Sequence, residues 1–284
     1  MAGVIASWER HGGQQVPGPS GAGTRLLLAG DTHGNLDWIG TLSKLAARHG
    51  CEGVVQLGDF GLWADQRALR NEALAVINDR WLTAVARTAA LHGVWWRVID
   101  GNHDAHPLAR ARYQADDNGV RPLRDGVLDW ADRGAVWSWA GRRFAALGGA
   151  VSIDKDFRRE GVSWWPTEEI TDEEVDALIA RAGTEPVDVL LTHDAPLLPD
   201  GIRPLSNQVL RERCERSIAQ VLRAVDALRP RLVVHGHYHV RWSGLLERPW
   251  GTVRVEGLAS DEQNYQHGHA WSVLALNQLA VAGE

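Results

Sequence analysis

The 284-residue chain contains few cysteines and no long apolar run. Its two cysteines, Cys51 and Cys214, are far apart and form no Cys-x-x-Cys pair, which excludes a disulfide framework. No stretch approaches the roughly 18 apolar residues that a transmembrane helix needs, and the N-terminus lacks a basic segment followed by an apolar one. We therefore expect a cytoplasmic protein that does not associate with membranes.

Lysine is also scarce, with Lys44 and Lys155 as the only examples, and the formal net charge is −6. An acidic balance without a lysine-rich stripe argues against a protein that mainly grips a nucleic-acid backbone. What remains is a composition typical of soluble globular proteins, with 44% hydrophobic and 23% charged residues.

Residues 1–24 are rich in Gly, Pro, Ser and Gln, so we expect a flexible N-terminal leader there. Residues 25–284 show no internal repeat and no clear boundary, which predicts a single domain.

The first half of that domain alternates between strand and helix patterns. Short apolar runs predict strands over 26–29, 53–57 and 94–99. Apolar spacing predicts a helix over Leu36–His49, with Asn35 as its N-cap. The alanine- and leucine-rich pattern predicts one or two helices over Asp65–Leu91. A βαβαβ order implies a parallel sheet.

The second half is less regular and richer in strands. Residues 135–139 and 142–147 predict a hairpin, residues 148–165 a loop, and Thr171 the start of a helix with an acidic first turn. The remaining expected elements are a strand at 187–191, a helix at 206–228, a strand at 232–235 and short strands from residue 243 onward.

Side chains capable of binding metal lie at or just past the ends of five predicted strands. They are Asp31, His33, Asp59, Asn102, His193, His237 and His239. Oxygen and imidazole ligands without thiolate suit divalent Mn, Fe, Co, Ni or Zn and disfavour a structural zinc site. Seven ligands are too many for one ion but suit two ions that share a carboxylate, which would lie about 3.5–4 Å apart.

The ordered set of motifs around these residues resembles the calcineurin-like metallophosphoesterase superfamily over residues 25–240. The motifs are Gly30-Asp31-Thr32-His33-Gly34, Gly58-Asp59, Gly101-Asn102-His103-Asp104, Thr192-His193 and Gly236-His237-Tyr238-His239. The resemblance implies an α/β fold, namely the two-sheet β-sandwich flanked by helices that is the metallophosphoesterase fold.

By this resemblance, Asp31, His33, Asp59 and His239 hold one ion, whereas Asp59, Asn102, His193 and His237 hold the other. Asp59 would be the bridge, and Mn is the metal expected first, with Fe, Zn, Ni or Co as alternatives. The implied reaction is the attack of a metal-bridging hydroxide on a phosphoester.

Two neighbouring residues are expected to act on the substrate rather than on a metal. His103 would protonate the leaving oxygen or stabilise the transition state, and Asp104 would orient its ring. His235, inside the last core strand, is expected to be packed and hydrogen-bonded.

The second motif, Gly58-Asp59-Phe60-Gly61, lacks the arginine found in serine/threonine protein phosphatases and dinucleoside tetraphosphate hydrolases, and the third ends in Asp104 rather than glutamate. Both departures favour the bacterial and phage-type phosphodiesterase group, with small phosphodiesters or cyclic nucleotides as substrates. The alternatives are a phosphomonoesterase or protein phosphatase, a nuclease of the same superfamily, and a non-catalytic interaction module.

The loop at 148–165 carries two arginines and two tryptophans, Arg158, Arg159, Trp164 and Trp165. Arg158 could clamp a phosphate while Trp165 stacks on a base. The alternative is a solvated arginine pair beside tryptophans that seal the sheet edge. The sequence leaves the oligomeric state open.

Overall fold

The computed structural model describes residues 24–65, 76–203, 205–261 and 269–282. The predicted leader, apart from Thr24, lies outside these residues. None of the helices described is long and apolar enough to cross a membrane.

The chain begins with the predicted βαβαβ unit. Strand β1 (Arg25–Ala29), helix α1 (Leu36–Arg48), strand β2 (Gly53–Gln56), helix α3 (Asp79–Leu91) and strand β3 (Trp95–Val98) follow in order. The three strands pair in parallel, which confirms the prediction. The Asn35 side chain accepts a hydrogen bond from the Trp38 amide and so caps α1 as expected. Of the predicted helical stretch 65–91, α3 covers the second half, and residues 66–75 lie outside the described part.

A seven-stranded sheet, the first sheet, grows from this unit in the order β13-β12-β1-β2-β3-β5-β4. Its further strands are β4 (Val120–Arg124), β5 (Leu128–Ala131), β12 (Trp271–Ala275) and β13 (Ala280–Ala282), and helix α4 (His106–Arg112) precedes β4. Sequence patterns did not predict α4, β4 or β5. Strand β4 contains Pro122 and a register shift between Pro122 and Arg124, features that a sheet tolerates at its edge.

The second sheet has six strands in the order β10-β11-β9-β8-β7-β6. These are β6 (Val136–Trp139), β7 (Arg142–Leu147), β8 (Val189–Thr192), β9 (Leu232–His235), β10 (Trp242–Arg248) and β11 (Gly251–Gly257). The predicted hairpin is β6–β7. Its two turn residues, Ala140 and Gly141, both have positive φ (45° and 74°), as a two-residue hairpin turn requires.

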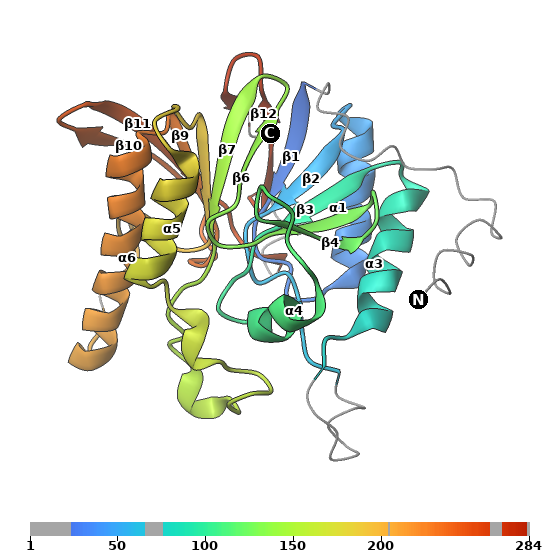
Figure 1. Ribbon diagram of the computed structural model, residues 1–284, viewed down its shortest axis with the longest axis horizontal. Helices are drawn as coiled ribbons and strands as arrows, with labels where there is room; N and C mark the ends of the chain where they lie inside the picture. The colour runs from blue at the N-terminus through green and yellow to red at the C-terminus, as the bar shows by residue number, and fades with distance from the viewer. Residues whose placement is uncertain (1–23, 66–75, 204, 262–268, 283–284) are drawn as a thin grey trace.

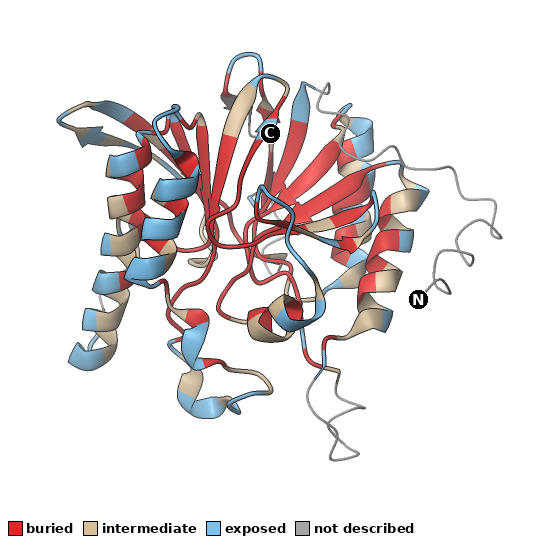
Figure 2. Ribbon diagram, in the orientation of Figure 1, coloured by how far each residue is buried: buried red, intermediate tan, exposed pale blue. Residues whose placement is uncertain are grey.

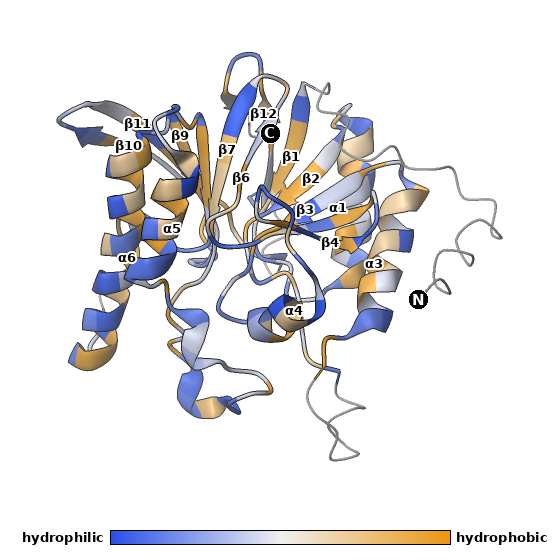
Figure 3. Ribbon diagram, viewed as in Figure 1, coloured by the Kyte–Doolittle hydropathy of each residue, from blue (hydrophilic) through white to orange (hydrophobic). Residues whose placement is uncertain are grey.

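The two sheets face each other and helices cover their outer faces (Figure 1). Helices α5 (Asp172–Ala182) and α6 (Gln208–Leu228) pack on the second sheet, and α1 and α3 on the first. Figure 2 shows the strands as the buried interior, and Figure 3 shows apolar residues on the sheets and on one side of the helices. The predicted fold class is therefore confirmed.

Strand β1 illustrates how the sequence produces these layers. Leu26 and Leu28 lie in the cluster between the two sheets, whereas Leu27 and Ala29 lie in the cluster beneath α1 and α3. All four are at most 2% exposed. Because successive side chains point to opposite faces of a strand, a strand buried on both faces needs a continuous apolar run, which Leu26–Ala29 provides.

Replacing Leu28 by alanine should lower the free energy of unfolding by about 2–5 kcal/mol, because it leaves a cavity between two sheets that cannot collapse. Urea unfolding followed by circular dichroism would measure the change. Leu91→Ala makes the same substitution at a side chain that is 83% exposed and should change stability by less than about 0.5 kcal/mol. Equal effects at both positions would contradict the layered core.

Candidate metal centre

The seven predicted ligands come together at one edge of the sandwich. Each lies one to four residues past the end of β1, β2, β3, β8 or β9. Parallel strands within a sheet bring their carboxyl ends to the same edge, and here the two sheets bring those edges together. The first sheet supplies Asp31, His33, Asp59 and Asn102, and the second supplies His193, His237 and His239.

The backbone at this edge is held in an uncommon conformation. Four of the predicted ligands have left-handed φ values: His33 (41°), Asp59 (51°), His237 (66°) and His239 (55°). Residues with a Cβ atom seldom adopt this region, and where they do, surrounding structure must hold them. The turns after β1, β2 and β9 therefore aim their side chains at the cost of local strain, a pattern common at functional sites.

The glycine that precedes each of three predicted ligands makes room for a predicted ligand from another motif. A Cβ atom on Gly58 would lie 2.3 Å from His193 Nδ1, one on Gly101 would lie 2.1 Å from Asp59 Oδ1, and one on Gly236 would lie 2.3 Å from Asp31 Oδ1. Any larger residue would displace these side chains. The motif glycines are thus required by the close approach of neighbouring strand ends.

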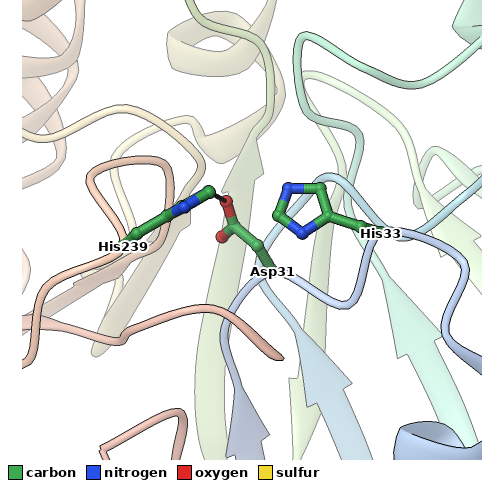
Figure 4. A group of neighbouring side chains, drawn as sticks. All are labelled: Asp31, His33 and His239. Carbon is green, nitrogen blue, oxygen red and sulfur yellow. Dashed lines mark ion pairs between the residues drawn. The ribbon is translucent and has the colours of Figure 1, made fainter. Parts of the chain in front are cut away.

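Asp31 lies between two histidines at one side of the centre (Figure 4). Its Oδ1 accepts a hydrogen bond from the His237 amide at 3.1 Å. Its Oδ2 lies 3.1 Å from His239 Nε2 yet is fully buried and has no hydrogen bond from the described residues. The His33 ring donates from Nδ1 to Asp261 at 2.9 Å, which directs its Nε2 toward Asp59 at 3.8 Å.

Asp59 lies at the middle of the cluster. Its Oδ2 is 3.8 Å from His33 Nε2 and 3.5 Å from His193 Nε2, so it faces one histidine of each predicted ligand set. Two groups of residues each place their potential metal-binding atoms within 4.8 Å of one another. One group is Asp31, His33 and His239, and the other is Asp31, Asp59 and His193. Asp31 is thus common to both groups, although the resemblance assigned the bridge to Asp59.

The hydrogen bonding of His193 favours a cation. Its Nδ1 donates to the Leu57 carbonyl at 2.7 Å, so the neutral ring carries its lone pair on Nε2. That lone pair faces Asn102 Oδ1 at 3.0 Å and Asp59 Oδ2 at 3.5 Å, both of which are also acceptors. When the His193 ring is neutral, these three acceptors face one another without a donor, an arrangement that fits a metal ion. Asp31 Oδ2, which lacks a hydrogen bond from the described residues, fits one as well.

The carboxylates of this site raise the pKa values of two of its histidines. Burial disfavours the charged ring of His193, but Asp59 and Asp31 outweigh it and raise its pKa to about 10. Burial likewise opposes the charged ring of His33, but the Asp261 hydrogen bond and the nearby carboxylates raise its pKa to about 9. Burial favours protonated Asp59, yet the facing histidines hold its pKa well below the usual range.

His103 is half-buried at the rim of the cluster. Its Nε2 is 4.0 Å from Asp59 Oδ2, and its amide donates to Asp59 Oδ1 at 2.7 Å. Burial lowers the pKa of His103, and the positive charge of Arg158 contributes.

Asp104 has partners other than the one the sequence suggested. Its carboxylate is fully buried and accepts hydrogen bonds from four backbone amides, those of Phe60, Gly61, Leu62 and Gly101, at 2.8–3.1 Å. Burial and the charge of Asp59 raise its pKa to about 6, against the effect of these bonds. Asp104 thus ties the loop after β2 to the loop after β3, and its described hydrogen bonds do not include the His103 ring.

Arg158 and Trp165 lie in different surroundings. The Arg158 guanidinium, 8% exposed, donates to the Ser152 hydroxyl and to the Asn102 carbonyl beside His103. Trp165 is 5% exposed and lies in the core cluster of the first sheet, so its ring face is not offered to a stacked base. For this tryptophan the structure favours a packed position over one exposed for stacking.

Some buried or partly buried polar residues around the candidate centre carry no signal in the sequence. Asp261 binds His33 and Asn35. Glu168 binds Ser152, and Asp194 accepts hydrogen bonds from Ser217 and from Tyr238, which stands between two predicted ligands. His235 is fully buried and hydrogen-bonded to the Gly236 carbonyl, as predicted.

The fold is that of metallophosphoesterases. The family model for calcineurin-like phosphoesterases matches residues 24–241, and the chain therefore belongs to that family. This membership supports metal-dependent hydrolysis of a phosphoester. No match was found among curated proteins.

Solved structures with the same fold include TT1561 of Thermus thermophilus, with 15% sequence identity and a TM-score of 0.55 over 92% of this chain and 98% of that chain. A dimetal phosphatase from Danio rerio has 16% identity and a TM-score of 0.53 over 90% of this chain and 93% of that chain. At these identities the likeness shows the fold.

Metal binding should release protons near neutral pH. With pKa values of about 9 and 10, His33 and His193 are protonated at pH 7.5, and each must lose its proton to bind an ion. Titration of Mn²⁺ in two buffers of different ionisation enthalpy should show about one to two protons released, and the apparent affinity should rise with pH up to about 9–10. His33→Asn should reduce the count by about one. A heat that is the same in both buffers would contradict this balance.

Asp104→Asn should destabilise the fold. The new amide nitrogen would face backbone N–H groups, and loss of two hydrogen bonds to a charged group should lower the free energy of unfolding by about 3 kcal/mol. Thermal unfolding of the metal-free protein measures this. Asp37→Asn, an exposed residue on α1, is the matched control. Unchanged stability with an altered pH–rate profile would instead support the role in orienting His103.

Proposed function

We propose that this chain is a dinuclear metal-dependent phosphodiesterase of the bacterial and phage-type group that hydrolyses small or cyclic nucleotide-type phosphodiesters. The observation that carries the proposal is the cluster of buried carboxylate, amide and imidazole groups built from both sheets, above all Asp31 Oδ2, which has no hydrogen bond from the described residues, and His193 Nε2. Such a cluster needs cations, and the ligand types suit Mn²⁺ first.

Seven side chains would hold the ions. Asp31, His33 and His239 lie together on one side, and Asn102, His193 and His237 on the other. Asp59 faces histidines of both sides and would bridge them. Two such ions, when bound, lower the pKa of a shared water enough to supply hydroxide near pH 7 and offset the charge on the phosphoryl oxygens.

The chain's own residues would bind and orient the phosphoester. His103 is placed to donate a hydrogen bond to a phosphoryl oxygen or a proton to the leaving oxygen, because its ring stands at the rim beside Asp59. Arg158 adds a positive charge on the side of Asn102. The Asp261 carboxylate keeps the Nδ1–H tautomer of His33, which turns Nε2 toward the centre.

The turn after β2 supports a diester over a monoester. In this chain the turn is apolar, with Phe60 and Leu62 fully buried, and a Cβ atom on Gly61 would lie 2.6 Å from the Gly34 Cα. It therefore adds no arginine to the site. A phosphodiester carries one negative charge, whereas a monoester carries about 1.5–2 at pH 7, so a diester needs less positive charge from the protein.

A phosphomonoesterase is the second candidate, because one neighbour of similar fold is named a dimetal phosphatase. A nuclease receives less support from a chain with a net charge of −6. The cytoplasmic location stays a prediction.

The test is a comparison of bis(p-nitrophenyl) phosphate with p-nitrophenyl phosphate on protein stripped with chelator and restored with Mn²⁺. We expect metal-dependent turnover that favours the diester. Loss of a residue that only hydrogen-bonds to a metal ligand lowers activity by up to roughly 100-fold. Asp59→Asn changes a predicted ligand itself and should therefore lower kcat by more than that. His103→Ala should lower kcat by about 10²–10⁴-fold.

Asp37→Asn is the matched control for Asp59→Asn and should leave turnover unchanged. A preference for the monoester would favour the phosphatase candidate. If two ions bind and neither ester is hydrolysed, the proposed substrate class is wrong.

A further inference from the structure

A buried polar junction lies behind the predicted ligand Asn102. It consists of Ser152, from the loop after β7, and Glu168, at the end of a short 3₁₀ helix (Pro166–Glu168). Both are at most 1% exposed. The Ser152 amide donates to Glu168 Oε1 at 2.9 Å, and the Ser152 hydroxyl donates to Oε2 at 2.6 Å. Neither residue belongs to a motif of the metal centre.

The number of hydrogen bonds that the Ser152 hydroxyl can donate and accept sets the orientation of the Asn102 side-chain amide. A serine hydroxyl has one proton and two lone pairs, and here the hydroxyl uses its proton to donate a hydrogen bond to Glu168. The hydroxyl can therefore only accept from its other neighbours. Asn102 Nδ2 occupies one lone pair at 3.0 Å, which leaves Asn102 Oδ1 facing His193 Nε2. A flipped amide would point its NH₂ group at the ions.

The second lone pair of Ser152 accepts from Arg158 Nη1, whose Nη2 reaches the Asn102 carbonyl at 3.4 Å. One hydroxyl therefore holds both the amide that would bind an ion and the guanidinium beside it. Its hydrogen-bonding capacity is then full, since it donates once and accepts twice.

Both ends of the junction are anchored to the same ion pair. Arg133 donates to the Glu168 carbonyl at 2.9 Å and pairs with Asp100 at 2.8 Å, and Asp100 stands two residues before Asn102. Neither Arg133 nor Asp100 has an exposed side chain. The distance between Glu168 and Asn102 is therefore set by buried charges, and the hydroxyl between them cannot turn freely.

We propose that Ser152 and Glu168 are positioning residues for the metal centre: Glu168 accepts the hydrogen bond of the Ser152 hydroxyl, and Ser152 thereby directs Asn102 Oδ1 toward one of the two ions and holds Arg158 beside it. This inference rests on the two-metal site of the proposed function but not on which phosphoester is hydrolysed.

The decisive variant is Glu168→Gln, which keeps the shape and reverses the hydrogen bond. The glutamine NH₂ would donate to the Ser152 hydroxyl, whose proton would turn to Asn102 and favour the flipped amide. Titration of Mn²⁺ into the chelator-treated full chain should show affinity lowered about 10–100-fold at one of two sites, with the other unchanged. Ser152→Ala, which removes the acceptor, should weaken the same site.

Glu169→Gln is the matched control, because the Glu169 carboxylate pairs with Arg213 of α6. It should retain both wild-type affinities, and thermal unfolding of each metal-free variant would show that the fold is intact. If Glu168→Gln does not fold, Ser152→Ala provides the same measurement.

Wild-type affinity at both sites in a folded Glu168→Gln or Ser152→Ala variant would overturn the inference, as would an equal loss at both sites. Neither result would affect the proposed reaction. Conversely, a wild-type protein that binds two Mn²⁺ ions without hydrolysing either ester would overturn the proposed function, and the selective loss in Glu168→Gln would still support the positioning role.

Discussion

The structure depends on a convergence of buried carboxylate and imidazole groups at the edge shared by the two sheets. Asp31 Oδ2 has no hydrogen bond from the described residues, and His193 Nε2 faces two further acceptors. An uncompensated group of this kind is costly inside a protein. The acceptors remain together because five strand ends from two sheets meet there. A candidate cation site is therefore produced by the packing of the strands themselves.

The same convergence explains features that look unrelated in the sequence. Gly58, Gly101 and Gly236 are small because each lies against a ligand from another strand. The left-handed turns at Asp59 and His237 direct side chains inward where an ordinary turn would not. Asp104 completes the arrangement by binding the amides of two neighbouring loops with one carboxylate. Small residues, uncommon backbone conformations and hydrogen bonds thus all help to bring the predicted ligands together in the candidate metal centre.

Much of this could be predicted from local patterns. The apolar run at Leu26–Ala29 and the helical spacing after Asn35 specify buried elements by themselves, and polar residues at strand ends indicate where they meet. Strand β4, with Pro122 and a bulge, has no such period. Asp261 and Glu168 lie far along the chain from the ligands they serve, and only folding brings them close. Trp165 shows a further limit, since an aromatic residue in a loop has the same local pattern whether it is packed or exposed.

The division of the ligands between the sheets has a mechanical consequence. The first sheet carries Asp31, His33, Asp59 and Asn102, and the second carries His193, His237 and His239, so bound ions would join the two halves of the sandwich across their shared core. Separation of the sheets would then require loss of the ions, and the free energy of unfolding would increase with metal concentration. In such a protein the metal ions would also hold the two sheets together, and the stability of the folded chain would depend on the supply of metal.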